Sequence, residues 1–305
     1  MMRTYTSKEA QAFVEKNIAR AKRPPTIDAK LRRARAAAGR KDTELARKAL
    51  STGSLDIKRL DKLARERDKA RRSRAKEQHR LAVKNSAAVA KWLSGQVLPV
   101  VPADPMNIII DRVTFIRTFA DQGVVTDSNI GSLDNWAKYK YQPSSSDAVL
   151  ETGTGKLSFF VLWQNPRSDT IVANVGPRVQ VNANLSVSAD WNGVASWYLP
   201  DSRAIATVRS RTTVFAMDSS INSIVSDVIL GNDSVSGGFF GGDDSTSLAI
   251  DQFMPGAGVF VPANAFILIE VSLVTEWQIL DGSVTLDADS GSFQVTVPHL
   301  IITVT

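Results

Sequence analysis

Apolar and polar side chains alternate strictly along several segments in the last two-thirds of the chain. Between residues 179 and 188 the odd positions are Val, Val, Ala, Leu and Val, and the even positions are Gln, Asn, Asn, Ser and Ser. This period of two predicts a β-strand with one buried face and one solvated face. Residues 267–277 and 293–304 show the same alternation, and Pro298 interrupts the later segment, as expected at a bulge or a sheet edge.

Shorter segments of the same kind lie between loops rich in Gly, Asp, Ser and Pro, such as Gly237–Asp244. Further strands are expected over 107–119, 156–164, 195–199, 203–217, 225–230 and 283–287. The residues after Asp218 also fit a short helix over 218–230. Eight or more strands with little helix between them predict a mainly β fold, an antiparallel jelly-roll β-sandwich formed by residues 106–305.

The first third of the chain has a different pattern. Residues 8–20 fit a short amphipathic helix, which must end before the prolines at positions 24 and 25. From about 55 to 93 there is no Gly or Pro and good helix formers dominate, which predicts one long helix. We therefore divide the chain into a helix-prone N-terminal arm (1–97), a Pro-rich linker (98–105) and the sandwich domain.

Charge separates the same parts. The first hundred residues hold 27 of the 37 Lys and Arg and 10 of the 31 Asp and Glu, so the formal charge is +17 there and −11 in the remainder. A basic arm suits a polyanion, and release of counterions from phosphates would drive the contact. The cations of the long helix are expected on every face, without base-specific contacts. The alternative is a solvated, charged spacer. The candidate nucleic-acid-binding residues are Arg32, Arg33, Arg35, Arg40, Lys41, Lys58, Arg59, Lys62, Arg65, Arg67, Lys69, Arg71, Arg72, Arg74, Lys76, Arg80 and Lys84.

The reactive side chains argue against an enzyme. The chain has no Cys, which excludes disulfides, thiolate catalysis and zinc sites of the Cys type. Its two histidines, His79 and His299, lie in the arm and in the final strand, and neither a G-x-S-x-G motif nor a Gly-rich phosphate loop is present. The N-terminus lacks the apolar run of a signal peptide, and the longest apolar run, 265–269, is too short to span a membrane.

Two pairs of carboxylates are candidate calcium ligands. Asp243 and Asp244 are adjacent, Asp287 and Asp289 are separated by one residue, and both pairs lie in predicted loops. Calcium takes about six to eight oxygen ligands, so an ion held by either pair would have to be shared at a subunit contact. The alternative is that all four are ordinary turn aspartates. No other cofactor is expected.

The layout of basic arm, Pro-rich linker and β-sandwich resembles the coat (capsid) proteins of small icosahedral viruses, particularly positive-strand RNA viruses of the tombusvirus, sobemovirus and nodavirus kind. Val261–Leu273 is similar in style to a late shell strand of those proteins. The resemblance implies sandwiches that self-assemble into an icosahedral shell, in a virion assembled in the host cytoplasm. It also implies arms that bind the genome, with single-stranded RNA favoured.

Two other functions remain open. One is the capsid protein of a small single-stranded DNA virus, because no residue distinguishes ribose from deoxyribose. The other is a cellular β-sandwich binding module with a nucleic-acid tether, which predicts a ligand pocket lined by aromatic residues such as Trp163, Trp191 and Trp197. The chain also ends on a predicted strand, 301–305, so the projecting domain of some tombusvirus-like coats is not expected.

Overall fold

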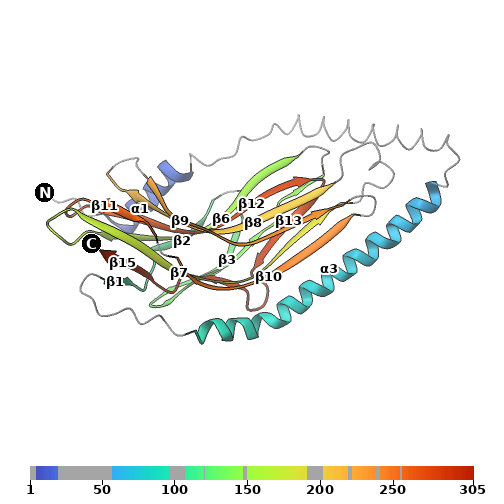
Figure 1. Ribbon diagram of the computed structural model, residues 1–305, viewed down its shortest axis with the longest axis horizontal. Coiled ribbons are helices and arrows are strands. Elements are labelled where there is room, and N and C mark those ends of the chain that lie inside the picture. The colour runs from blue at the N-terminus through green and yellow to red at the C-terminus, as the bar shows by residue number, and fades with distance from the viewer. Residues whose placement is uncertain are drawn as a thin grey trace.

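The computed structural model describes residues 5–19, 57–96, 107–119, 121–146, 150–190, 202–218, 222–237, 241–254 and 256–305. Within them two antiparallel β-sheets stack face to face, and the long helix α3 (Ile57–Ser94) runs along one side of the stack (Figure 1). The fold is therefore mainly β, and the long helix is confirmed. The predicted linker 98–105 and the predicted strand 195–199 lie outside the described residues.

The larger sheet is organised around β7 (Ile171–Ala189). One edge of β7 pairs with β10 and β11, and the other pairs with β13, β14 and β15. β4 connects β3 to β13 and β14, while β1 pairs with β15 and β5 with β13. The bounds are β1 Asn107–Ile110, β3 Val124–Gly131, β4 Asp134–Tyr141, β5 Ser144–Ser145, β10 Gly242–Phe253, β11 Gly258–Val261, β13 Gly282–Ala288, β14 Gln294–Thr296 and β15 Leu300–Val304.

The smaller sheet has the strand order β2–β6–β12–β8–β9. Its centre is β12 (Phe266–Leu280), which pairs along nearly its whole length with β6 on one side and β8 on the other. The remaining bounds are β2 Phe115–Thr118, β6 Glu151–Gln164, β8 Arg203–Ala216 and β9 Asn222–Ser236. All pairings in both sheets are antiparallel among the described strands. The jelly-roll connectivity stays a prediction.

The core lies between the sheets and follows the period of two. The odd-numbered apolar residues of β7 from Val179 to Val187 are buried there, as are Ile267, Ile269, Val271 and Leu273 of β12. Removing these branched side chains from water is the main stabilising term of the sandwich. The alternation therefore predicted the core-facing side of both strands.

The prediction of a helix over 218–230 is wrong, because residues 222–236 form β9. The predicted loop 237–244 is also partly strand, since β10 begins at Gly242. The start of β10 reads Gly-Asp-Asp-Ser-Thr-Ser, a polar run without alternation, and it becomes a strand by pairing with residues 184–189 of β7. Local sequence carries no signal for that pairing.

The N-terminal helix α1 (Ser7–Phe13) continues as one π-helical segment, η1 (Val14–Ala19). A capping box starts α1: the Thr6 hydroxyl accepts from the Glu9 N–H, and the Thr6 N–H donates to the Glu9 carboxylate at 2.8 Å. Together α1 and η1 confirm the short helix predicted over 8–20. Across the described residues, no helix has the length and apolar character that a membrane span requires.

Candidate nucleic-acid interface

Helix α3 consists of a basic part and a nearly uncharged part. Residues 57–80 contain eleven Lys or Arg and four Asp or Glu, whereas residues 81–94 contain two Lys and no acid. The first part would lose solvation if it were buried, because it carries a net positive charge. The second part has the composition of a helix that packs against protein.

The nearly uncharged part of α3 docks on the outer face of the larger sheet. Ser86 and Leu93 are buried there. The Asn182 side-chain amide donates to the Ser86 carbonyl at 2.9 Å, and the Gln180 amide donates to the Leu93 carbonyl at 3.1 Å. The Ser292 N–H donates to the Ser86 hydroxyl oxygen at 3.0 Å. These bonds connect α3 to β7 and to the turn before β14, so the helix has a fixed position on the sandwich.

The docking corrects the prediction of a solvated face on β7. Asn182 and Asn184, at the polar positions of the alternation, are only 2% and 3% exposed. The sequence predicted polar residues facing water, and they instead face a helix from a distant part of the chain. Buried amides need hydrogen-bond partners, and α3 supplies one for Asn182.

Seven exposed cations of the basic part form a stripe along α3. Lys58, Lys62, Arg65, Lys69, Arg72, Lys76 and Arg80 follow one another at intervals of four, three, four, three, four and four residues. That spacing places them on a single helix face, and all seven are exposed. The stripe is about 33 Å long at about 1.5 Å per residue.

The stripe does not include every cation of α3, and the expectation that cations lie on every face of the long helix stays a prediction. Arg59 and Arg74 are exposed and lie off the stripe, and Lys84 is exposed on the docked part. The side chains of Arg67 and Arg71 lie outside the described side chains, and Arg32, Arg33, Arg35, Arg40 and Lys41 lie outside the described residues. The intervals of three and four were present in the sequence, so the stripe could have been found without a structure.

One flank of the stripe carries acids. Glu66 and Glu77 lie roughly a quarter turn around the helix from it, and both are exposed. Glu77 accepts two hydrogen bonds from the Arg80 guanidinium at 2.6 and 2.8 Å. Those hydrogen bonds lower the pKa of Glu77 and raise that of Arg80. Arg80 therefore keeps its charge, partly compensated, at the docked end of the stripe.

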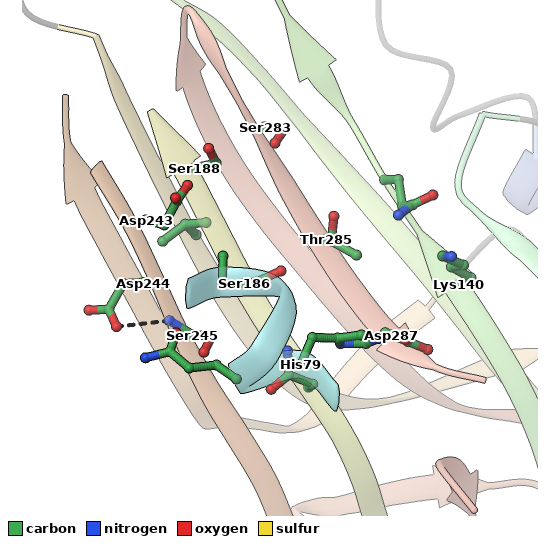
Figure 2. A pocket seen from close by; sticks show the side chains of 15 residues that line it. His79, Lys140, Ser186, Ser188, Asp243, Asp244, Ser245, Ser283, Thr285 and Asp287 are labelled. Atoms are coloured by element: carbon green, nitrogen blue, oxygen red, sulfur yellow. Dashed lines mark hydrogen bonds and ion pairs between the residues drawn. The ribbon is translucent and has the colours of Figure 1, made fainter. Parts of the chain in front are cut away.

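The other flank faces a cavity of about 220 Å³ between α3 and the larger sheet. Figure 2 shows one turn of α3 crossing the strand that carries Ser186, with Asp244 on one side and Asp287 on the other. Ala75, Gln78 and His79 contribute the helix side of the lining, and hydroxyl and carboxylate groups contribute most of the sheet side. Three of the four predicted calcium ligands, Asp243, Asp244 and Asp287, line this cavity.

Asp287 is held by a local network. It accepts hydrogen bonds from the Ser290 hydroxyl at 2.6 Å, the Asp289 N–H at 2.9 Å and the Ser290 N–H at 3.0 Å. His79 Nε2 lies 3.3 Å from its Oδ2 atom. Burial raises the pKa of Asp287, but these hydrogen bonds and the nearby His79 together lower it by more than burial raises it. The pKa of Asp287 therefore lies below its ordinary value. The carboxylate thus anchors α3 to β13.

Asp289, the fourth predicted ligand, accepts a hydrogen bond from the Thr126 hydroxyl at 2.6 Å. Asp244 acts instead on Asp233, whose pKa is raised by burial and then by the neighbouring charge of Asp244. Among the side chains that the structure describes, no three His, Cys, Asp or Glu residues gather in a way that could hold a metal ion. Calcium at these aspartates stays a prediction.

Comparison with known proteins gives weak similarities. No family model and no curated protein matches the chain. One similar solved structure is that of infectious bursal disease virus, Gx strain, with 10% identity over 59% of this chain and 39% of that one and a TM-score of 0.17. A CocE/NonD family hydrolase from Staphylococcus aureus has 9% identity over 51% and 33% of the two chains, also with a TM-score of 0.17.

A third similar structure is the VP2 subviral particle of infectious bursal disease virus. It has 10% identity over 69% of this chain and 45% of that one, with a TM-score of 0.16. The chain thus spans less than half the length of each of these three structures. Alignments with TM-scores this low carry no argument about the fold or the function.

Proposed function

We propose that the chain is a structural protein that self-assembles into a closed shell and packages nucleic acid with its basic N-terminal residues. The observation that carries the proposal is α3: a stripe of seven exposed cations on a helix whose other end is fixed to a sandwich of opposite net charge. Figure 1 shows the N-terminal end of α3 extending past the ends of the strands. The cations are therefore accessible to a polyanion larger than the protein.

The chemistry of the stripe favours phosphate backbones over bases. Lys and Arg side chains neutralise phosphates and release their counterions, a contribution that is independent of sequence. Residues 57–80 contain no Phe, Tyr or Trp on which a base could stack. The expected activity is nonspecific, salt-sensitive binding, as packaging of a whole genome requires.

The finer assignment is a virion capsid protein with an icosahedral homo-oligomeric shell and a single-stranded RNA genome, assembled in the host cytoplasm and without enzymatic activity. It is supported by the division of charge and by the likeness in layout to small RNA-virus coats. Calcium shared between subunits at Asp243, Asp244, Asp287 and Asp289 belongs to the same proposal. A single-stranded DNA genome is the alternative, and it would leave every residue assignment unchanged.

Sedimentation velocity of the full-length protein, recorded at 260 and 280 nm, tests the proposal. A megadalton boundary that absorbs strongly at 260 nm is expected, and digestion of the extracted nucleic acid with RNase or DNase would identify the genome. A slow boundary with a protein-like absorbance ratio, unchanged by added RNA and calcium, would contradict shell formation. That outcome would favour a cellular binding module.

A further inference from the structure

The smaller sheet carries an apolar patch on the face that points away from the sandwich core. We call it the outer patch; its buried members are Phe115, Phe160, Phe215, Met217 and Leu268. Phe160 and Leu268 lie at the positions that alternate with core residues of β6 and β12, so they face the opposite side of the sheet. Helix α1 and η1 fill the outer patch with Ala10 and Val14, both fully buried.

Polar and aromatic contacts surround the outer patch. The Tyr5 hydroxyl donates to Asp218 at 2.5 Å, and Arg117 forms an ion pair with Glu15 at 2.8 Å. Tyr5 also packs edge-on against Phe266, with ring centroids 5.3 Å apart. The outer patch therefore matches residues 5–19 in both its apolar and its polar contacts.

The helix and the outer patch depend on each other. A helical segment as short as residues 5–19 is marginal alone in water, so it gains its structure from docking. Without the helix, the aromatic residues of the patch would form an exposed apolar surface of the kind that drives association. The helix needs an outer patch and the outer patch needs a helix, but neither need specifies that the two belong to the same chain.

The segment that joins η1 to α3 is long. Thirty-seven residues separate Ala19 from Ile57, and such a length can span up to about 120 Å. Figure 1 places α1 at one end of the molecule and the first residues of α3 at the opposite end. The two described elements that this segment joins therefore lie far apart along the long axis of the molecule. A reach of up to about 120 Å is also long enough for residues 5–19 to dock on a second copy.

We propose that in the assembled protein residues 5–19 of one copy dock on the outer patch of a second copy. The inference rests on the proposed self-assembly. When two copies exchange residues 5–19, every contact seen within one chain forms again between the copies, so the exchange costs little free energy. It also connects each subunit to its neighbour through a continuous backbone. The ligand of the outer patch is thus the N-terminal helix of another copy of this chain.

The test uses the absence of cysteine in the chain. Glu15→Cys and Arg117→Cys are combined in the full-length protein, and assembled particles are treated with a short bis-maleimide before denaturing electrophoresis. Bands at twice the subunit mass and above are expected. The matched controls are the two single-cysteine variants, which cannot be bridged within the docked pair. A second pair, Tyr5→Cys with Asp218→Cys, covers the case in which the first does not fold.

The outcomes separate the two proposals. Bridged bands only at the subunit mass, in particles that form normally, would overturn exchange and leave the proposed function standing. A double-cysteine protein that forms no particles under conditions where the unmodified chain also forms none would contradict the proposed function itself. Particles dissociated and diluted before treatment should show mainly the subunit-mass band, because docking then returns to the same chain.

Discussion

Two glycines of β6 show how single residues fit the sandwich together. Gly153 lies opposite Trp277 in the ladder with β12, and a Cβ at this position would overlap the indole ring. A Cβ on Gly155 would likewise overlap the ring of Tyr141. The Trp277 indole N–H donates to the Tyr141 hydroxyl at 2.7 Å, so the two rings have fixed positions over the glycines. The missing side chains therefore make room for an aromatic pair.

Replacing Gly155 by Ala should destabilise the protein. The Tyr141 ring cannot move without breaking its bond to Trp277, and overpacking of this kind costs about 1–3 kcal/mol. Denaturant unfolding measures the free-energy difference. Gly95→Ala is the matched control, because a Cβ there meets only backbone oxygens at an ordinary 3.5 Å. Equal stability of the two variants would show that the Tyr141–Trp277 pair is not rigid.

Asp287 should make the docking of α3 sensitive to acid. Its pKa is lowered in the folded protein, so it stabilises the fold above its unfolded-state pKa, and this contribution is lost as the pH falls through the folded-state value. Asp287→Asn should cost about 2 kcal/mol at neutral pH, typical of hydrogen bonds to a buried charged group. Hydrogen exchange of residues 75–94 at several pH values is the measurement.

In the unmodified protein, protection of this segment should decline toward acid pH. In Asp287→Asn it should be lower at neutral pH and nearly independent of pH. The ionised form of Asp233 contributes to stability with the opposite sign from that of Asp287, because the raised pKa of Asp233 makes its ionised form unfavourable at neutral pH. Asp233→Asn is therefore the control, and it should not reduce the protection of α3.

At the scale of elements, α3 combines two functions in one helix. Its last residues, from His79 onward, contact the larger sheet through Asp287, Asn182 and Gln180. Its earlier residues present the cation stripe. A continuous helix joins the two parts, so the position of the docked end sets the direction of the stripe. A flexible basic tail would have no such direction.

Neutralising the stripe should weaken nucleic-acid binding more than neutralising other cations. We compare Lys62→Gln, Lys69→Gln and Lys76→Gln combined with Arg59→Gln, Arg74→Gln and Lys91→Gln combined, each a loss of three exposed charges. Three lost phosphate contacts should make the log–log salt slope less steep by about 2 units with a single strand. Fluorescence anisotropy with a labelled oligonucleotide over a range of salt concentrations measures it.

The control triple should keep a slope near that of the unmodified protein. Equal changes in both triples would show that binding depends on total charge rather than on the stripe. Binding that neither triple affects would place the contact in the cations outside α3.

At the scale of the molecule, the described parts of the arm contact both sheets. Residues 5–19 cover the outer patch of the smaller sheet, and residues 75–96 lie on the larger sheet. The predicted boundary near residue 97 thus separates parts of opposite net charge. The described residues of the arm nevertheless pack against the sandwich. The sandwich is expected to need part of the arm for its stability.

Removing residues 1–19 should therefore expose the outer patch. The truncated protein should bind a dye specific for apolar surface, such as ANS, and should aggregate, while the cation stripe is retained. The matched control is Lys16→Gln in the full chain, which changes an exposed residue of η1. A truncated protein that stays soluble without increased dye binding would show that residues 5–19 are not needed to cover the patch.

Sequence alone determined much of this protein. Strand periodicity gave the core-facing side of β7 and β12, and the absence of Gly and Pro gave α3. The count of charges gave the opposite net charges of the first hundred residues and the remainder. The cation stripe was also readable, since it follows from the spacing of residues on a helix. All of these are local properties, fixed by backbone sterics and by the periods of helix and strand.

Only the tertiary structure decided which distant residues meet. It placed α3 over the polar face of β7, gave Asp243, Asp244 and Asp287 a common cavity, turned a polar run into β10 and seated α1 on the outer patch. Each of these depends on pairing between segments that are far apart in the chain. Their energy comes from contacts that no short stretch of sequence contains, so periodicity could not reveal them.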